Sequence, residues 1–207
     1  MKQIQLFFLI LIMMCVTSNA QDITLPKPEK KGGKPLMEVL AARQSNRAYS
    51  PQYLSEQQLS NLLWAANGIN REDNGKRTAP SARNCQEIDV YVFTEKGIFL
   101  YEPQEHYLKL IRSGDYRKEA AKQDFAAEAP ILLIYVANYD KMTAYDDEGR
   151  AFYGATDCGN VSQNVYLYCA SEELHTVAIG MINRDKIKEL IGFNGKAILG
   201  QPVGFPK

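Results

Sequence analysis

The sequence lacks the residue patterns that mark several common kinds of site. Its 24 basic and 24 acidic side chains cancel at neutral pH, so the net charge gives no indication of a nucleic-acid partner or an anionic surface. The chain has only two histidines, His106 and His175, and neither stands at metal-ligand spacing from other candidate ligands. No Gly-x-Ser-x-Gly elbow, Walker loop or Rossmann glycine pattern occurs. The sequence therefore predicts neither a metal centre nor a self-contained catalytic set.

Cysteine is also scarce. Of the four cysteines, Cys15 lies in an apolar N-terminal run, which leaves Cys85, Cys158 and Cys169. An odd number of cysteines without metal-ligand spacing does not favour a disulfide framework. Cys158 and Cys169 fall in an apolar helical stretch, where free cysteine behaves as a small buried apolar residue.

The N-terminus has the three parts of a secretory signal. Lys2 supplies positive charge, an apolar run covers 6–16, and Ser18-Asn19-Ala20 places small residues at the two positions that a signal peptidase inspects. A membrane anchor is the alternative, but the run is shorter than the ~20 residues needed to span a bilayer. A lipid anchor at Cys15 is disfavoured because the bulky Met14 precedes it. We therefore predict export to the periplasm or the exterior, with cleavage after the alanine of this tripeptide.

Removal of the predicted signal peptide, residues 1–20, leaves enough chain for one domain of ordinary size. Residues 21–35 are rich in Pro, Lys and Gly and show no apolar period, which predicts a flexible, exposed leader. Regular structure is expected to begin near Pro35, and the functional domain is expected to cover 36–207.

Apolar periodicity predicts interleaved helices and strands along this domain. Ser55 is a candidate N-cap, and Gln58 three residues later completes a capping-box pattern. The continuous apolar run at 131–137 is typical of a strand that is buried on both faces. Helices are predicted at 36–43, 55–67, 103–128, 149–174 and 184–191, and strands at 88–94, 97–101, 131–137, 176–182 and 197–203, with a polar loop at 69–79. This order indicates an α+β fold with helices packed on a central sheet.

The predicted long helix carries many small side chains on one side. They are Ala151, Gly154, Ala155, Cys158, Gly159 and Ser162. Small side chains let another backbone approach closely. The residues alone favour tight packing within one chain, and a subunit interface is the second interpretation.

Arg43-Gln44-Ser45-Asn46-Arg47, at the end of the first predicted helix, is a candidate phosphate site. Arginine offers a planar, permanently charged pair of donors, which matches the oxygens of a phosphate. Two arginines four positions apart, with a hydroxyl and backbone N–H groups between them, can surround one phosphomonoester. Taken alone, the segment is more typical of a solvated helix end, where arginine favours the helix dipole.

Residues 78–86, just before the first predicted strand, are a candidate ring-binding loop. Their sequence is Thr-Ala-Pro-Ser-Ala-Arg-Asn-Cys-Gln, and such small and amide side chains can lie flat against a planar ring. In isolation, this segment is more typical of an ordinary loop that enters a strand. Phosphate-binding and ring-binding elements without a catalytic set indicate that a cofactor carries the reaction.

Five motifs in order resemble the nitroreductase family of FMN flavoenzymes. Arg-x-Ser-x-Arg at 43–47 is followed by Leu-Leu-Trp-Ala-Ala at 62–66, and then by Ala-Pro-Ser-x-x-Asn-x-Gln at 79–86. Gln-Asn-Val-Tyr-Leu at 163–167 and Thr-Val-Ala-Ile-Gly at 176–180 complete the series. The resemblance covers about 36–205, and Leu-Trp-Ala-Ala-Asn-Gly-Ile-Asn is similar to the branch of azoline-oxidising flavin oxidases.

The resemblance implies a three-layer α/β/α sandwich with a mostly antiparallel sheet, forming an intertwined homodimer with FMN at the interface. It also assigns the small residues of the long helix to that interface. The implied FMN contacts come from three segments, for the phosphate and ribityl chain, for the ring, and for the other ring edge. They are Arg43, Gln44, Ser45 and Arg47; Pro80, Ser81, Ala82 and Asn84; and Ile179 and Gly180.

The sequence departs from the family pattern at two places. Many members have Gly-Leu-Gly before the Thr-Val strand, whereas this chain has only Leu174-His175 there. The chain also ends at Lys207, close behind the last predicted strand, whereas members with a basic C-terminal phosphate contact usually extend further.

We interpret the chain as an exported FMN-dependent oxidoreductase. It would pass hydride or electrons through the flavin N5 between a small-molecule substrate and an electron donor. Two alternatives stay open at this point: a flavin-binding or small-ligand-binding protein without turnover, and an envelope protein that has kept the fold without the cofactor.

Overall fold

A seven-stranded antiparallel sheet forms the centre of the structure. The computed structural model describes residues 21–207, so the predicted signal peptide lies outside the described residues. The strand order is β1-β6-β5-β4-β7-β9-β8, and every neighbouring pair is antiparallel. The strands are β1 (Ile23–Thr24), β4 (Ile88–Phe93), β5 (Gly97–Glu102), β6 (Tyr107–Ser113), β7 (Ile131–Asn138), β8 (His175–Thr176) and β9 (Gly195–Gly204). A separate hairpin pairs β2 (Ile69–Arg71) with β3 (Lys76–Arg77).

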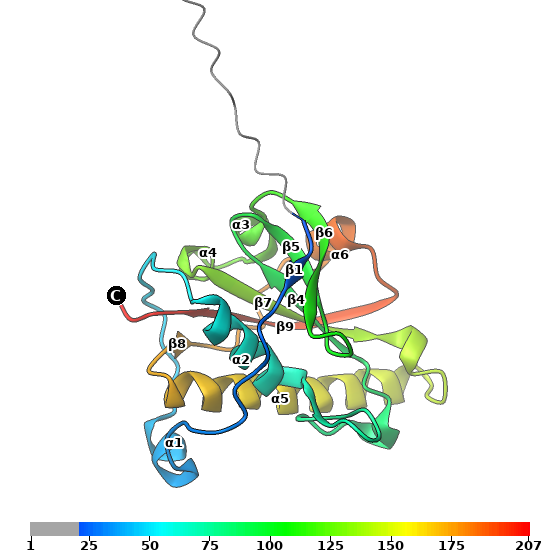
Figure 1. Cartoon of the computed structure of the whole chain (residues 1–207). Helices are drawn as coiled ribbons and strands as arrows, with labels where there is room; N and C mark the ends of the chain where they lie inside the picture. The colour runs from blue at the N-terminus through cyan, green and yellow to red at the C-terminus, as the bar shows by residue number, and fades with distance from the viewer. Residues whose placement is uncertain (1–20) are drawn as a thin grey trace, which may run out of the picture.

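Helices cover both faces of the sheet, which gives three layers (Figure 1). One face carries α2 (Glu56–Asn67) and α5 (Asp147–Ser171), with α1 (Leu36–Ala42) against α5; the other carries α3 (Arg117–Ala120), α4 (Asp124–Glu128) and α6 (Arg184–Ile191). The expected α/β/α sandwich with a mostly antiparallel sheet is confirmed. Across residues 21–207, no helix has the length and apolar character required to cross a bilayer.

The side chains of β7 alternate between the two cores. Leu133 and Tyr135 pack in the core beneath α2 and α5, whereas Leu132 and Ile134 pack in the core beneath α3, α4 and α6. Every residue from 131 to 137 is buried. The expectation of a strand buried on both faces is therefore confirmed, and β7 is the element that joins the two cores.

Two features bring α5 close to the sheet. A Cβ added at Gly154 would lie 2.9 Å from the Cβ of Ala137, so only glycine fits there without a shift of β7. Farther along the helix, the hydroxyls of Ser162 and Tyr135 both donate to Oε1 of Gln201, at 2.8 and 2.7 Å. All three side chains of this polar cluster are buried, so their mutual hydrogen bonds replace those lost to water.

The N-terminus of α2 agrees with the capping-box prediction. The Ser55 side chain accepts from the backbone N–H of Gln58 at 3.2 Å, and the Gln58 side chain accepts from the backbone N–H of Ser55 at 3.0 Å. These reciprocal bonds satisfy two helix-terminal donors and fix where α2 begins.

Two expected assignments are corrected by the structure. The helix predicted over 103–128 is wrong in its first half, because β6 lies there and pairs with β5. Leu108 is fully buried while Lys109 is exposed, which is the alternation of a half-buried strand. The polar loop predicted at 69–79 contains the β2–β3 hairpin, which turns at Gly75 with a φ of +65°.

The strand predicted at 176–182 is much shorter in the structure. The backbone N–H of Ala178 donates to the hydroxyl of Tyr166 at 2.8 Å instead of to a neighbouring strand. The chain then contacts β9 again through an isolated bridge between Ile179 and Gly200. A side chain of α5 therefore interrupts the ladder that the sequence pattern predicts.

Part of the predicted leader belongs to the fold. β1 pairs with β6 at the edge of the sheet, and Leu25 is buried in the core beneath α2. The expectation that regular structure begins near Pro35 is therefore wrong, because a pairing partner 80 or so positions away is not visible in local composition.

A chain of hydrogen bonds attaches the leader to the sheet and to α2. Nδ1 of His106 lies 2.9 Å from the Tyr101 hydroxyl, and Nε2 lies 2.7 Å from Oγ of Ser60. Ser60 donates its hydroxyl proton to the carbonyl of Pro26 at 2.6 Å. This order requires a neutral His106 that carries its proton on Nε2 and accepts from Tyr101 at Nδ1. Burial lowers the pKa of His106, and the charge of Lys30 lowers it further.

We predict that this histidine makes the protein less stable in mild acid. The folded-state pKa lies below the unfolded-state value of about 6.5, so the unfolded state takes up the proton first and the free energy of unfolding falls as the pH drops through that value. In His106→Gln this component of the pH dependence is absent, and stability at pH 7.5 falls by about 1 kcal/mol through the lost hydrogen bonds. Urea denaturation from pH 5 to 7.5 measures both effects. An equal pH slope in wild type and variant would contradict the assignment.

Candidate functional site

The Arg43–Arg47 segment leaves the C-terminal end of α1 and runs beside β8. The N–H of Asn46 donates to the carbonyl of Thr176 at 2.9 Å, and Nδ1 of His175 lies 2.7 Å from the carbonyl of Ala48, to which it donates. These bonds fix the C-terminal part of the segment. The position is therefore set by β8 rather than by the helix that precedes it.

Tyr166 of α5 holds the middle of the segment. Its hydroxyl accepts from the N–H of Ala178 at 2.8 Å and lies 2.9 Å from Oγ of Ser45. The Arg43 guanidinium lies over the Tyr166 ring, 5.3 Å from its centroid, within reach of a cation–π contact. One tyrosine thus orients two of the predicted phosphate contacts.

Arg47, the second predicted phosphate arginine, is exposed, and its guanidinium lies 5.8 Å from the Phe125 ring of α4. Neither Arg43 nor Arg47 forms an ion pair within the described part of the chain. Their charges are therefore available to an anion.

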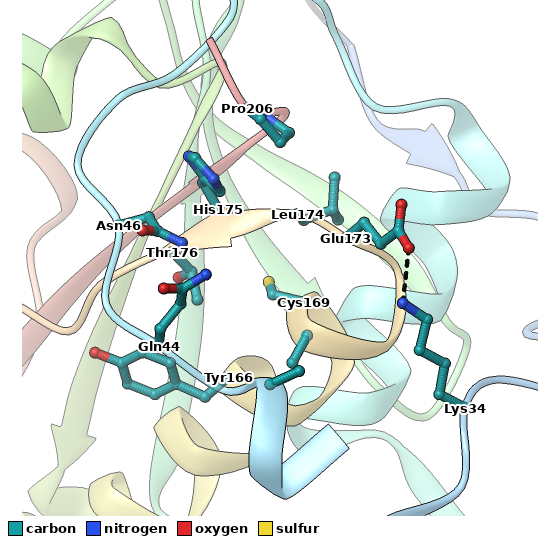
Figure 2. Close-up of a pocket in the computed structure, with 12 residues that line it drawn as sticks. Lys34, Gln44, Asn46, Tyr166, Cys169, Glu173, Leu174, His175, Thr176 and Pro206 are labelled. Atoms are coloured by element: carbon teal, nitrogen blue, oxygen red, sulfur yellow. Dashed lines mark hydrogen bonds and ion pairs between the residues drawn. The ribbon is translucent and has the colours of Figure 1, made fainter. Parts of the chain in front are cut away.

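A pocket of about 250 Å³ lies between this segment, the C-terminal end of α5 and β8 (Figure 2). Gln44 and Asn46 line it from one side and His175 from another. At its opposite rim Lys34 and Glu173 form an ion pair with an N···O distance of 2.7 Å. The amide, imidazole and charged groups make this a polar recess next to the predicted phosphate segment.

The loop that contains Pro80–Asn84 has an unusual backbone. Arg83, Asn84 and Gln86 have φ values of +53°, +56° and +51°, a region in which side-chain-bearing residues cost roughly 1–3 kcal/mol each. Internal hydrogen bonds hold this conformation: Gln86 N–H donates to Oγ of Ser81 at 2.9 Å, and Asn84 N–H donates to its carbonyl at 3.0 Å. Strained backbone of this kind is typical of segments that present groups to a ligand.

The long helix α5 also anchors this loop. Oδ2 of the buried Asp157 accepts from the N–H of Ala82 at 2.8 Å, and Nδ2 of Asn160 donates to the carbonyl of Pro80 at 3.3 Å. Pro80 and Asn84 remain exposed. The loop therefore turns an outward face to the surroundings while its backbone is tied to the helix.

The two predicted binding segments contact different parts of α5. Tyr166 and Asp157 are nine positions apart, which corresponds to about 13 Å along the axis and to roughly opposite sides of the helix. Figure 1 agrees, since α1 lies near one end of α5 and the segment after α2 lies near the other. The structure therefore does not bring the Arg43 and Pro80 segments together within one chain.

The third predicted segment follows β8 in the chain. Ile179 is buried and bonds to Gly200 in both directions, whereas Gly180 is exposed with open space where a side chain would be. The guanidinium of Arg184 donates to the carbonyl of Gly180 at 3.3 Å. Gly180 can thus be approached from outside, while Ile179 is a core residue.

Comparison with known proteins identifies the group to which these features belong. The model of the nitroreductase family matches residues 40–205. The chain belongs to the nitroreductase family. A nitroreductase relative from Methanocaldococcus jannaschii is 34% identical over an alignment 197 residues long, and the match covers 90% of this chain and 97% of that protein. Members of the family are generally flavin-dependent oxidoreductases. Family membership therefore identifies this chain as an oxidoreductase.

Solved structures of nitroreductases agree with the fold. A nitroreductase from Ralstonia eutropha JMP134 is 40% identical, with 93% of this chain and 92% of that chain covered and a TM-score of 0.87. An NADPH:FMN oxidoreductase from Vibrio harveyi is 20% identical, with 83% and 69% covered and a TM-score of 0.64. The second likeness shows the shared fold alone.

The small residues of α5 lie on two faces of the helix. Gly154, Cys158 and Ser162 are buried against the sheet, whereas Ala151, Ala155 and Gly159 are exposed. Each set repeats every four positions and forms one stripe along the helix. The structure therefore confirms close packing within the chain for half of the residues and leaves the other half on an open face.

Exposed apolar side chains add to that open face and to the region around α1. Phe152 is 63% exposed and Met37 is 75% exposed. Leu36 and Leu40 of α1 are also exposed. Such surface is expensive to leave in water and is typical of a surface that another chain covers.

Sequence reasoning missed the residues that position the nitroreductase segments. Tyr166 stood within a quoted motif but received no role, and Asp157, Asn160 and His175 were not singled out as anchors. Their contacts join positions 75 to 127 residues apart. A capping or periodicity signal does not report contacts of that range, so the sequence offered no direct indication.

We predict that Tyr166→Phe weakens the hold on the phosphate segment. The change keeps the ring under Arg43 and leaves the Ala178 N–H without its acceptor, which costs roughly 1 kcal/mol or more. Chemical denaturation measures the loss. Tyr153→Phe on the same helix is the control, because no hydrogen bond of its hydroxyl is present in the described residues. Equal stability of the two variants would contradict the role of the Tyr166 hydroxyl.

Proposed function

We propose that this protein binds FMN and acts as an FMN-dependent oxidoreductase on small molecules. The observation that carries the proposal is the Arg43–Arg47 segment. Two permanently charged guanidinium groups without acidic partners flank a serine hydroxyl and exposed backbone. This donor set fits a dianionic phosphomonoester, the group that distinguishes FMN from riboflavin.

In this proposal the chain binds and orients while the cofactor reacts. Arg43, Ser45 and Arg47 hold the phosphate, and Gln44 extends toward the ribityl chain. When bound, FMN supplies the ring N5 through which hydride or electrons pass between donor and acceptor.

The ring is assigned to the strained loop. Pro80, Ser81 and Ala82 offer a narrow surface against which a flat ring can lie, and the Asn84 amide provides a donor for a ring carbonyl. Because hydrogen bonds to Asp157 and Asn160 fix this loop before any ligand arrives, little ordering is left to occur on binding. Gly180 leaves room for the other ring edge.

A complete site in this proposal requires two copies of the chain. The phosphate segment and the ring loop contact nearly opposite sides of α5, so one FMN molecule draws them from different protomers. The exposed Ala151, Ala155 and Gly159 stripe allows close approach of a second chain, and Phe152 and Met37 supply apolar surface to bury. We therefore propose a homodimer with FMN between the subunits.

We predict that Arg43→Ala combined with Arg47→Ala yields colourless protein. Each arginine contributes roughly 1.5–3 kcal/mol as a charged hydrogen-bonding partner, so each loss weakens FMN about tenfold to a hundredfold. The absorbance spectrum of purified protein and a fluorescence titration with FMN measure the effect. Lys31→Ala with Lys188→Ala removes the same charge from exposed positions and serves as the control. Yellow protein with an unchanged flavin spectrum in the double arginine variant would overturn the assignment.

Stopped-flow mixing with a reductant then separates turnover from simple binding. Fast bleaching followed by reoxidation supports an oxidoreductase, whereas a bound flavin that stays oxidised supports a flavin-binding protein without turnover.

We also propose export, because 1–20 carries a charged start, an apolar run and small residues at the cleavage positions. We predict that protein recovered from the native host begins at Gln21. N-terminal sequencing or intact mass checks this, and a retained Met1 would contradict it.

A further inference from the structure

Glu87, which precedes β4, is the side chain whose burial the assignments above leave unexplained. It is fully buried, and neither of its carboxyl oxygens has a hydrogen-bonding partner in the part of the chain that the structure describes. An ionised carboxylate in that position is costly, because burial removes the water that would stabilise its charge. A buried carboxyl under these conditions keeps its proton.

The groups around Glu87 come from three elements. Asp157 and Cys158 belong to α5, Lys141 belongs to the short turn η2 (Tyr139–Lys141), and Cys85 lies just before Glu87. Burial of the Cys158 thiol raises its pKa to about 12, so that group stays neutral. Cys85 also has a raised pKa through burial and through the acidic pair.

Lys141 does not neutralise Glu87 directly. Its ammonium lies 2.6 Å from Oδ1 of Asp89 and donates to the carbonyl of Gln86 at 3.4 Å. Burial raises the pKa of Glu87 to about 7, and the neighbouring Asp157 raises it as well, against the opposite effects of its own backbone amide and Lys141. Charge, burial and the missing partners therefore agree on a carboxyl that is protonated below neutrality.

Asp157 links this carboxyl to the strained loop. It is 5% exposed and uses Oδ2 to accept from the N–H of Ala82, so its second oxygen can accept a proton from a neutral Glu87. We propose that Glu87 and Asp157 share one proton and that this acid pair positions the Ala82 backbone, which makes ligand binding at the loop depend on pH. Glu87 is a positioning residue in this scheme, since it acts on the loop through Asp157.

Loss of the proton leaves two negatively charged, buried carboxylates next to each other. Their repulsion weakens the anchor of a loop that contains three residues with left-handed backbone, and the loop then relaxes. The step is a plain acid–base equilibrium, in which the proton passes to water and no oxidant or reductant is needed. The part of the proposal that concerns FMN rests on the proposed function, whereas the shared proton does not.

Infrared spectroscopy tests the shared proton without any cofactor. Wild-type protein is expected to show a carboxylic-acid C=O band that disappears as the pH rises through about 7. Glu87→Gln removes the band while its amide still donates to Asp157. Asp157→Asn supplies an amide donor to Glu87, keeps it ionised, and so removes the band at a lower pH. Absence of any such band in wild type at pH 6, or its persistence in Glu87→Gln, would overturn the assignment.

Thermal unfolding gives a second readout that is independent of the cofactor. The folded-state pKa of Glu87 is raised above the unfolded-state value of 4.5, so wild type loses stability as the pH rises from there to about 7 and then levels off. Glu87→Gln lacks this component, so its midpoint is expected to rise relative to wild type by at least about 2 °C between pH 5 and pH 8. A constant difference across that range would count against a buried shared proton.

The pH profile of FMN affinity tests the link to the loop. Above neutrality the dissociation constant of wild type is expected to rise, by up to about tenfold per pH unit, relative to that of Glu87→Gln. The phosphate ionises identically in both titrations and cancels in the ratio. A ratio that stays flat, with the infrared band present, overturns the positioning role and leaves the proposed function intact. Failure of both proteins to bind FMN at any pH contradicts the proposed function and, with it, the FMN part of this proposal; the shared proton is still decided by the infrared band.

Discussion

The packing of α5 on the central sheet is the constraint on which the rest of the structure depends. The glycine at 154 sets how closely the helix approaches β7, and the buried Ser162–Gln201–Tyr135 cluster sets its position along the strands. Apolar contact alone permits a helix to slide or rotate on a sheet, because the hydrophobic effect is not directional. Hydrogen bonds inside the core have narrow geometric limits, and they remove that freedom.

Both predicted binding segments are attached to this helix by hydrogen bonds. Tyr166 orients the arginine segment from one side of α5, and Asp157 holds the strained loop from nearly the opposite side. Errors in the placement of α5 would displace both segments together. The positions of groups far apart in the sequence are in this way set relative to one rigid element, as precise binding sites require.

The sequence patterns predicted the elements whose causes are local. The apolar run of β7 and the capping box at Ser55 depend on neighbouring residues, and both are present in the structure. β1 was missed because its strand character comes from pairing with the distant β6, whereas β6 follows its partner β5 directly and was missed for a different reason. At Leu108 and Lys109 the alternation is short and the surrounding charges resemble those of a solvated helix. The same holds for the candidate site. Its binding motifs could be recognised in the sequence, whereas Tyr166 and Asp157, which position those motifs through long-range contacts, could not.

The two edges of the sheet bear on how readily the protein aggregates at high concentration. Each edge is closed by a strand of only two residues, β1 on one side and β8 on the other. A long bare edge would offer a ladder of unpaired amides and carbonyls to another chain and would invite fibrous growth. Here β1 covers two residues of the edge at β6, so a truncation that removes Ile23 and Thr24 leaves all seven residues of β6 without a strand partner on that side. The segment that composition describes as a linker is thus part of the sheet edge, and its removal lengthens the exposed ladder.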